Sequence, residues 1–191
     1  PEFGHLWVYN STTYGTFYHH KMSATPAQNY MFMSTSGALA SFTNGWGTAG
    51  PSSSLWSGTV GQLFSNGVPY MFYSWTGIDG FSKFDTYVGN GSTDGTFVYT
   101  GFKPRTIWIK STAAVSNYVF DTVRYPNNIV AENVVYDGNY SEASTGNEGL
   151  IVMSNGFKLA TTSTGTNNSG VKYIYGAWAE HPTFGEDGFS I

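Results

Sequence analysis

Short runs of alternating apolar and polar residues recur along the chain and are separated by glycine-containing turn pairs. Aromatic and β-branched residues dominate these runs, and side chains two positions apart lie on the same face of a strand. Asn-Gly or Asp-Gly pairs begin at residues 44, 66, 79, 90, 94, 137, 155 and 187. Such pairs favour the backbone conformation of tight hairpin turns. The pattern therefore predicts an all-β chain of short antiparallel strands.

The clearest predicted strands cover residues 6–9, 70–75, 97–100, 106–110, 150–153 and 171–178. We expect Phe97 and Tyr99 to share one face of their strand, because strand side chains alternate. Residues 150–159 predict a hairpin that turns at Ser154-Asn155-Gly156. Residues 113–123 are the one stretch where a helix competes, and their β-branched and aromatic content favours a strand.

The two halves of the chain contain matching segments. Trp108 lies 101 positions after Trp7, and the same spacing aligns Phe17 with Tyr118. The run at 67–75 aligns with the run at 170–178, where Trp75 matches Trp178 at a spacing of 103. The middles, roughly 24–60 and 125–165, do not align. We interpret the chain as an internal duplication with domains at 1–82 and 83–191, each a jelly-roll-like β-sandwich.

The first copy lacks the strand that opens the second. The second copy has a strand within 87–102 before its Trp108 strand, whereas almost nothing precedes the Trp7 strand, and Pro1 corresponds to Pro104. A chain that starts with Pro1 suggests a fragment or a processed product. A sheet without its opening strand has an unpaired edge, which proteins seldom leave unprotected. We therefore expect a preceding segment or a neighbouring chain to fill that edge.

The composition excludes several classes of partner and site. Charged residues make up 10% of the chain, aromatic residues 18%, and the net charge is −4 with eight Lys and Arg. Nucleic-acid binding needs a basic surface, so we expect none. The absence of cysteine rules out disulfides and thiolate sites. No run approaches a membrane span and no signal peptide is visible, so we expect no membrane partner.

Reactive constellations are also missing. His19 and His20 are adjacent on a predicted strand and would point to opposite faces, so they favour ordinary histidines over metal ligands. The acidic run 137–142 resembles a calcium loop only weakly. Asp-Gly pairs are explained by turn formation. No nucleophile, P-loop or dinucleotide motif is present. We expect no catalytic residue, metal or cofactor, and no enzymatic activity.

Three aromatic residues are candidates for ligand contact. Trp46, Trp56 and Tyr140 lie in Gly/Ser-rich segments outside the evident strands. Exposed aromatic rings stack well on sugars, which favours a glycan or receptor contact. The alternative, which we prefer, is that these rings cover the end of a core or fill a subunit interface. Four Asn-x-Ser/Thr sequons, at 10, 90, 139 and 167, are expected by chance in so Asn- and Ser-rich a chain.

Several segments of the second copy resemble a repeated domain in structural proteins of marine tailed bacteriophages, including cyanophages. They are residues 89–104, Trp108-Ile109-Lys110, residues 154–159, Asn168-Ser169-Gly170, Tyr173-Ile174-Tyr175 and residues 179–182. The first copy departs from the pattern, since it has Thr76-Gly77-Ile78 where Ala-Glu-His would stand. The resemblance implies a virion protein built of tandem β domains, with no catalytic residues to carry over.

The leading hypothesis is a non-enzymatic virion structural protein, either a tail fibre or a head decoration or fibre protein. We expect a homo-oligomer, a trimer if it forms a fibre, in contact with other virion proteins. The second hypothesis is a host-receptor or glycan-binding module of a phage adhesin. The third is a glycan-degrading enzyme, which would need two carboxylates across a groove.

Overall fold

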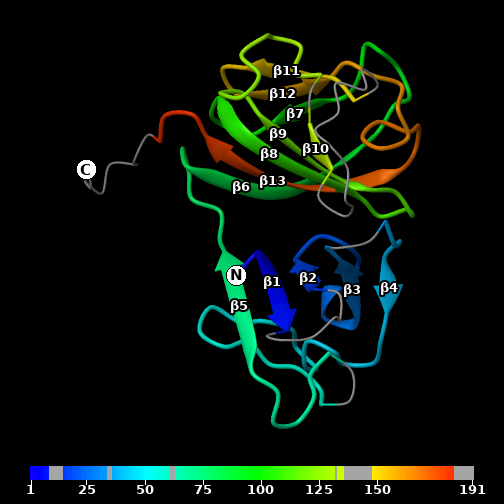
Figure 1. Cartoon of the computed structure of the whole chain (residues 1–191), viewed down its shortest axis with the longest axis vertical. Coiled ribbons are helices and arrows are strands. Elements are labelled where there is room, and N and C mark those ends of the chain that lie inside the picture. Colours follow the sequence, from blue (N-terminus) through cyan, green and yellow to red (C-terminus); the bar gives the residue numbers. More distant parts are fainter. Residues whose placement is uncertain (9–14, 34–35, 61–62, 132, 136–147, 183–191) are drawn as a thin grey trace.

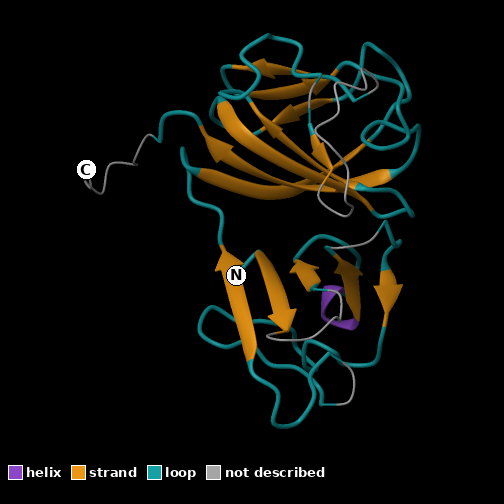
Figure 2. Ribbon diagram, in the orientation of Figure 1, coloured by secondary structure: helices purple, strands orange, loops and turns teal. Residues whose placement is uncertain are grey.

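The computed structural model describes residues 1–8, 15–33, 36–60, 63–131, 133–135 and 148–182. Within these ranges the regular elements are strands, apart from one 3-10 turn, η1 (Pro26–Gln28) (Figure 2). The predicted all-β fold is confirmed. The described residues include no helix with the length and apolar character needed to cross a bilayer.

The strands follow one another along the chain in two groups. The first group is β1 (Phe3–Val8), β2 (Thr16–His19), β3 (Asn29–Phe32), β4 (Ala40–Ser41) and β5 (Tyr70–Trp75). The second group is β6 (Ser82–Val88), β7 (Phe97–Tyr99), β8 (Pro104–Ser111), β9 (Asn117–Asp121), β10 (Val134–Val135), β11 (Leu150–Met153), β12 (Gly156–Leu159) and β13 (Lys172–Ala179). The predicted hairpin is β11–β12, with Met153 opposite Gly156, and residues 113–123 contain β9 and no helix, so both predictions are confirmed.

These strands form three antiparallel sheets. The first sheet has the order β4-β3-β2-β1-β5, the central sheet β10-β9-β8-β13-β6, and the outer sheet β11-β12-β7. The first sheet contains only strands that precede Thr76, and the other two contain only strands that follow Phe81. Figure 1 shows the first sheet in the lower part of an elongated molecule and the other two above it.

The first and central sheets share one hydrophobic core. Phe3 and Phe17 of the first sheet lie with their ring centroids 5.0 and 5.1 Å from that of Trp108 on β8. Phe84 of β6 stacks on Phe3 at 5.7 Å. Ile174 of β13 is buried in the same cluster. The two halves are therefore joined by packed aromatic side chains as well as by the linker of residues 76–81.

The opposite face of the central sheet packs on the outer sheet. Ile107 and Ile109 alternate with Trp108 along β8, so they belong to this second core, together with Tyr175 of β13 and Phe157 of β12. The second half thus has two facing sheets, as a sandwich requires. The described residues of the first half form a single sheet, so the predicted sandwich architecture takes the form of a stack of three sheets.

A loop covers the remaining face of the first sheet. Residues 42–58 cross that face, and the rings of Trp46 and Trp56 pack against Tyr18 of β2 at 5.9 and 5.6 Å. Gly4 of β1 leaves the space that the Trp56 ring occupies, which any larger residue would fill. The loop therefore replaces the second sheet that this half lacks among its described residues.

Strand order in the two halves is consistent with a duplication. The run β3-β2-β1-β5 of the first sheet corresponds to β10-β9-β8-β13 of the central sheet. Trp75 and Trp178, which match in sequence, lie on facing sheets with ring centroids 6.4 Å apart. The predicted boundary between residues 82 and 83 stays a prediction, since β6 begins there and both halves contribute to one core.

The pairing registers correct part of the sequence alignment. Trp75 pairs with Phe3 across the β1–β5 ladder, and Trp178 pairs with Thr106 across the β8–β13 ladder. If Trp75 is aligned with Trp178, Phe3 therefore aligns with Thr106. Pro1 then matches Pro104 as predicted, but Trp7 does not match Trp108. The register from the structure differs from the sequence alignment of the Trp7 strand by two residues, so the side chains aligned with each other still lie on the same face of the sheet. Similarly, Phe17 corresponds to Val119 instead of Tyr118, because Phe17 and Val119 pack in the shared core and Tyr118 packs in the other one.

The glycine-rich turn at 89–91 is held by an asparagine from the other end of the domain. The side-chain oxygen of Asn167 accepts a hydrogen bond from the Asn90 N–H, and its amide nitrogen lies 3.0 Å from Asn90 Oδ1 and 2.8 Å from the Ser92 carbonyl. A Cβ at Gly89 would collide with the backbone at Asn168. Gly91 has φ of +67°, which favours glycine. These motif residues therefore have structural roles.

The outer edge of β5 has no partner strand among the described residues. β5 ends the first sheet, and no other described strand pairs with its outer side. The corresponding side of β13 is occupied by β6. The strand predicted within 87–102 is β7, which pairs with β12 in the outer sheet, so the strand of the second half that has no described counterpart beside β5 is β6 instead. The expectation that another segment fills this edge stays a prediction.

We predict that Asn167→Ala lowers the free energy of unfolding by about 2–4 kcal/mol, because part-buried polar groups of the 89–92 turn and the buried Thr161 carbonyl lose their partner. Chemical denaturation would measure the loss. Asn168→Ala is the matched control, since the neighbouring side chain is exposed, and it should change stability by less than about 0.5 kcal/mol. Equal losses in both variants would contradict this account of the turn.

The stability of the fold should fall as the pH drops below about 6.5. Burial, followed by the charge of His20, lowers the pKa of His19 to about 3 from its ordinary value of 6.5. The unfolded chain therefore takes up a proton at His19 that the folded chain does not. The free energy of unfolding should decrease by up to about 1.4 kcal/mol per pH unit in this window.

Denaturant titrations at pH 7.5, 6.0 and 4.5 would test this dependence. His19→Gln should flatten the slope, whereas His181→Gln, which removes an exposed histidine, should leave it unchanged. Asp85, whose pKa is lowered, adds its own loss only below its usual value of 3.8 and so lies outside this window. The same slope in wild type and His19→Gln would overturn the assignment.

Candidate functional site

The structure corrects the expectation that Trp46 contacts a ligand. Its side chain is 0% exposed, and its indole N–H donates a hydrogen bond to the Asn29 carbonyl at 2.8 Å. Phe42 and Trp56 pack around it at 6.5 and 5.8 Å between ring centroids. Its ring is buried because the first sheet needs a cover for its far face. For Trp46, the alternative of capping a core is therefore confirmed.

Trp56 and Tyr140 have different outcomes. Trp56 is partly buried on Phe72, with centroids 3.9 Å apart, and its remaining surface lines a depression of about 340 Å³ together with Trp75, Ser74 and residues 52–55. This shallow surface still allows a ligand to contact Trp56. Tyr140 and the acidic run 137–142 lie outside the described residues, so the predictions about them stay predictions.

A larger cleft of about 530 Å³ lies where the two halves meet, and we call it the junction cleft. Its walls come from five stretches of the sequence, which no local pattern brings together. They are Glu2, His20 and Lys21 of the first half, the linker at 77–80, Ser82 to Asp85 of β6, and Tyr99 to Gly101. A volume of this size suits a small ligand, and sites between packed units are common.

Three of the charged groups in the junction cleft are engaged by protein groups. Lys21 Nζ lies 2.8 Å from Asp85 Oδ1, an ion pair between the two halves. Burial by itself raises the pKa of Asp85, but hydrogen bonds from Lys21 and from the Thr86 N–H outweigh it and hold the pKa below its usual value. The Glu2 carboxylate accepts a hydrogen bond from the Gly77 N–H at 2.9 Å.

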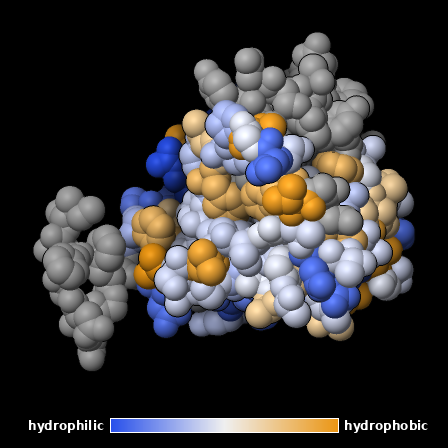
Figure 3. Space-filling model, turned by 90° about the horizontal axis from the view of Figure 1, so that it is seen from below, coloured by the Kyte–Doolittle hydropathy of each residue, from blue (hydrophilic) through white to orange (hydrophobic). Residues whose placement is uncertain are grey.

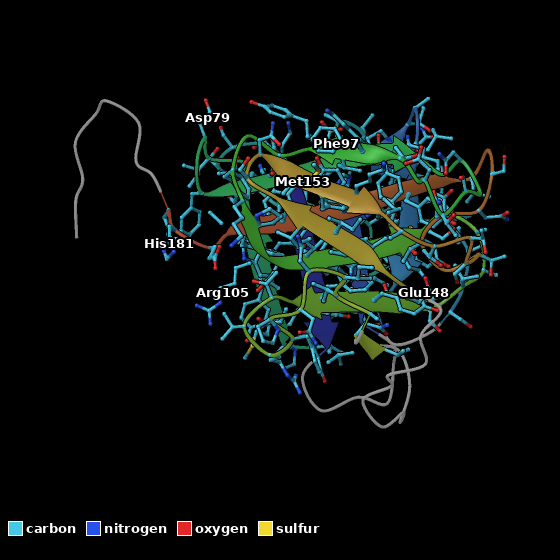
Figure 4. The ribbon with its side chains drawn as sticks, turned by 90° about the horizontal axis from the view of Figure 1, so that it is seen from above. Asp79, Phe97, Arg105, Glu148, Met153 and His181 are labelled. Carbon is cyan, nitrogen blue, oxygen red and sulfur yellow. The ribbon has the colours of Figure 1, made fainter. Side chains whose placement is uncertain are left out.

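Tyr99 is the most accessible aromatic group of the cleft. Its side chain is 59% exposed, and the Lys83 ammonium lies 5.0 Å from the centre of its ring, within cation–π distance. Tyr99 and Phe97 are both exposed whereas Val98 between them is buried, which confirms that they share a face of β7. Figure 4 shows Phe97 and Met153 over the outer sheet, which carries this apolar surface. Only Tyr99 of that surface lines the cleft.

The arrangement favours binding over catalysis. An ionised Asp85 engaged by Lys21 cannot act as a general acid, and the Glu2 carboxylate is already engaged by a backbone N–H. Glu148 is buried on the opposite side of the molecule from Asp79, and it accepts hydrogen bonds from the Ser163 and Thr166 hydroxyls (Figure 4). Hydroxyl-bearing ligands such as sugars fit a polar cleft with one open aromatic face.

The histidine pair serves the fold. β2 ends at His19, so the two rings are not held on opposite faces, and their centroids lie 5.1 Å apart. His19 Nε2 is 3.4 Å from the Tyr175 carbonyl oxygen, and His20 Nε2 is 2.9 Å from that of Phe84. In the part of the chain that the structure describes, no group of three or more His, Cys, Asp or Glu residues could hold a metal ion.

Sequence reasoning missed the junction cleft because its residues are far apart in the chain. Lys21 and Asp85 are separated by 64 positions, and nothing local links them. The one available signal was the alternation of exposed and buried residues along β7, which exposes Tyr99.

Comparison with known proteins identifies a family without an assigned role. No curated protein and no solved structure matches the chain. Residues 6–182 match a family model described as a domain of unknown function, DUF7483, and the chain therefore belongs to the DUF7483 family.

Proposed function

We propose that this chain is a non-enzymatic structural component displayed on a bacteriophage particle, as a tail fibre or as a head decoration or fibre protein. The observation that carries the proposal is the stacking of three sheets through two aromatic cores. Such a unit is stiff, because both faces of the central sheet are packed, and particle components need defined shape more than chemistry. The sequence resemblance to phage structural proteins supports the same assignment.

The surface of the chain also suits repeated assembly. Only 10% of residues are charged, and the face in Figure 3 is largely pale, with small separated apolar groups and few strongly hydrophilic ones. Contacts between copies of such a surface require little removal of water from ionised groups. Copies of this chain and other virion proteins are the partners that follow from the proposal, and a fibre would make it a trimer.

Antibodies against the chain would test the assignment. We expect them to label density-gradient-purified particles in electron microscopy at a fixed place, either along the tail or over the head. We also expect the purified chain to sediment as a homo-oligomer in analytical ultracentrifugation. Antigen found only in the soluble fraction of the lysate, with purified particles unlabelled, would refute the proposal.

A second candidate function is recognition of a host-surface glycan at the junction cleft. The observation that favours it is Tyr99, an exposed ring beside a lysine at the rim of a polar cleft of about 530 Å³. A sugar ring would stack on Tyr99 while Asp85, Lys21 and backbone groups accept and donate hydrogen bonds to its hydroxyls. The chain would then be the receptor-binding part of the same particle.

We predict that Tyr99→Ala weakens binding to any glycan that the wild-type chain captures on an array by about tenfold or more, because the stacking surface is lost. Phe97→Ala is the matched control, since Phe97 is 45% exposed on the same face of β7 but does not line the cleft. A blank array with a folded wild-type chain would remove this candidate. Retained binding in Tyr99→Ala would place the site elsewhere.

A further inference from the structure

The outer edge of β5 is unusual among the strand edges of the described chain. The other terminal strands of the sheets are β4, β10, β7 and β11, with two to four residues each, and β6, which carries Lys83 and Asp85. β5 has six residues, Tyr-Met-Phe-Tyr-Ser-Trp, and no charge. An open edge of this length and character tends to pair with another chain, and natural proteins usually shorten, charge or cover it.

Two of the other edges, those of β11 and β6, are protected in ways that β5 is not. Residue Val130 exchanges backbone hydrogen bonds with Leu150 beside β11, and the Asn128 side chain accepts one from the Val152 N–H. On β6, the His20 ring donates to the Phe84 carbonyl, and the Lys21–Asp85 ion pair lies beside it. Along β5, Met71 and Tyr73 are 49% and 50% exposed, although they stand on the side that faces the central sheet.

The second half of the chain shows which kind of strand fits this edge. There, β6 lies antiparallel to β13, with Trp178 opposite Ser82 and Tyr173 opposite Tyr87. Tyr87 stacks on Tyr173 with centroids 5.0 Å apart, and Phe84 meets Trp178 edge-on at 5.5 Å. With β5 placed on β13, Tyr70 and Trp75 coincide with Tyr173 and Trp178. The two rings that hold β6 therefore recur on β5 at the same positions.

We propose that the free edge of β5 is a docking site for a strand of the β6 sequence type, supplied by another unit of this family. The strand would run antiparallel to β5, with its tyrosine over Tyr70 and its phenylalanine against Trp75. The position of Ser82 would lie opposite Trp75 and that of Tyr87 opposite Tyr70. Cross-strand aromatic pairs of this kind stabilise a sheet, and ladder hydrogen bonds would satisfy the outward backbone groups of β5.

The occupied edge would also cover the half-exposed side chains of β5. The positions that correspond to Met71 and Tyr73 on β13 are Ile174 and Gly176, and both are buried. Tyr73 is larger than Gly176, so the incoming phenylalanine would lie beside the tyrosine ring and not over a glycine. Addition of this strand would bring β5 to the state that β13 already has. The docking site follows from the fold and does not depend on the role of the chain in a particle.

A fusion tests the docking site directly. A copy of residues 82–88 is placed before Pro1 through a Gly/Ser linker of 15 residues, the number that joins β6 to Pro104 in the second half. Hydrogen–deuterium exchange of residues 70–75 is then compared in the fused and unfused chains. We expect the outward amides of β5 to exchange about tenfold more slowly or more in the fusion, which should remain the same oligomer. Unchanged exchange at 70–75 would overturn the proposal.

A matched fusion separates this strand type from any extended segment. In the added copy alone, Phe84→Ser and Tyr87→Ser remove both aromatic rings and keep the length and charges. We expect its protection of β5 to be clearly weaker. Equal protection would overturn the claim of a β6-type strand. A second result would also overturn this claim: the unfused chain dimerises, its β5 amides become protected as its concentration rises, and the dimer persists in the fusion. The strand that pairs with β5 would then be β5 of a second copy.

Discussion

The apolar contact between the first and central sheets is the interaction on which the rest of the structure depends. The described first half has only one sheet, and the apolar face of a sheet must be buried against another element. Phe3 and Phe17 remove that face from solvent by packing on Trp108. Burial of each such side chain contributes about 1.5–3 kcal/mol. The junction cleft, the Lys21–Asp85 pair and the direction of the β5 edge all follow from where this contact places the two halves.

The same contact explains which titratable side chains near the junction are neutral and which are charged. His19 lies inside it and remains neutral, because burial opposes a charge there. Charged side chains lie at the rim of this contact, where water reaches them: Lys21 pairs with Asp85, and Lys83 lies beside Tyr99. A chain with few charges therefore concentrates several of them along one seam. That seam offers the most varied chemistry in the described part of the molecule, and a ligand would find both an aromatic face and hydrogen-bonding groups there.

Several glycines of residues 89–104 stand where the backbone comes close to another segment of the chain. Gly89 and Gly91 leave room for the chain at Asn167 to Ser169, and Gly95 does the same for Leu159. Asn167 then joins these turns through hydrogen bonds. Matching segments of this kind identify a fold and say little about a ligand. Among the surfaces that would decide function, Trp56 and the edge of β5 lie outside these segments, whereas Tyr99 lies within residues 89–104 with its side chain exposed.

Local information in the sequence determined the all-β character, the clearest strands, the hairpin at 150–159, the alternation of Phe97 with Val98 and the repeated runs that end at Trp75 and Trp178. Periodicity and turn residues act over a few positions, so they can be recognised without a structure. The register of β1 and the burial of Trp46 could not be recognised in this way, because both depend on what covers the first sheet. The junction cleft likewise depends on how two sheets pack. Only the tertiary structure decided these points, since packing brings together residues whose separation along the chain carries no local signal.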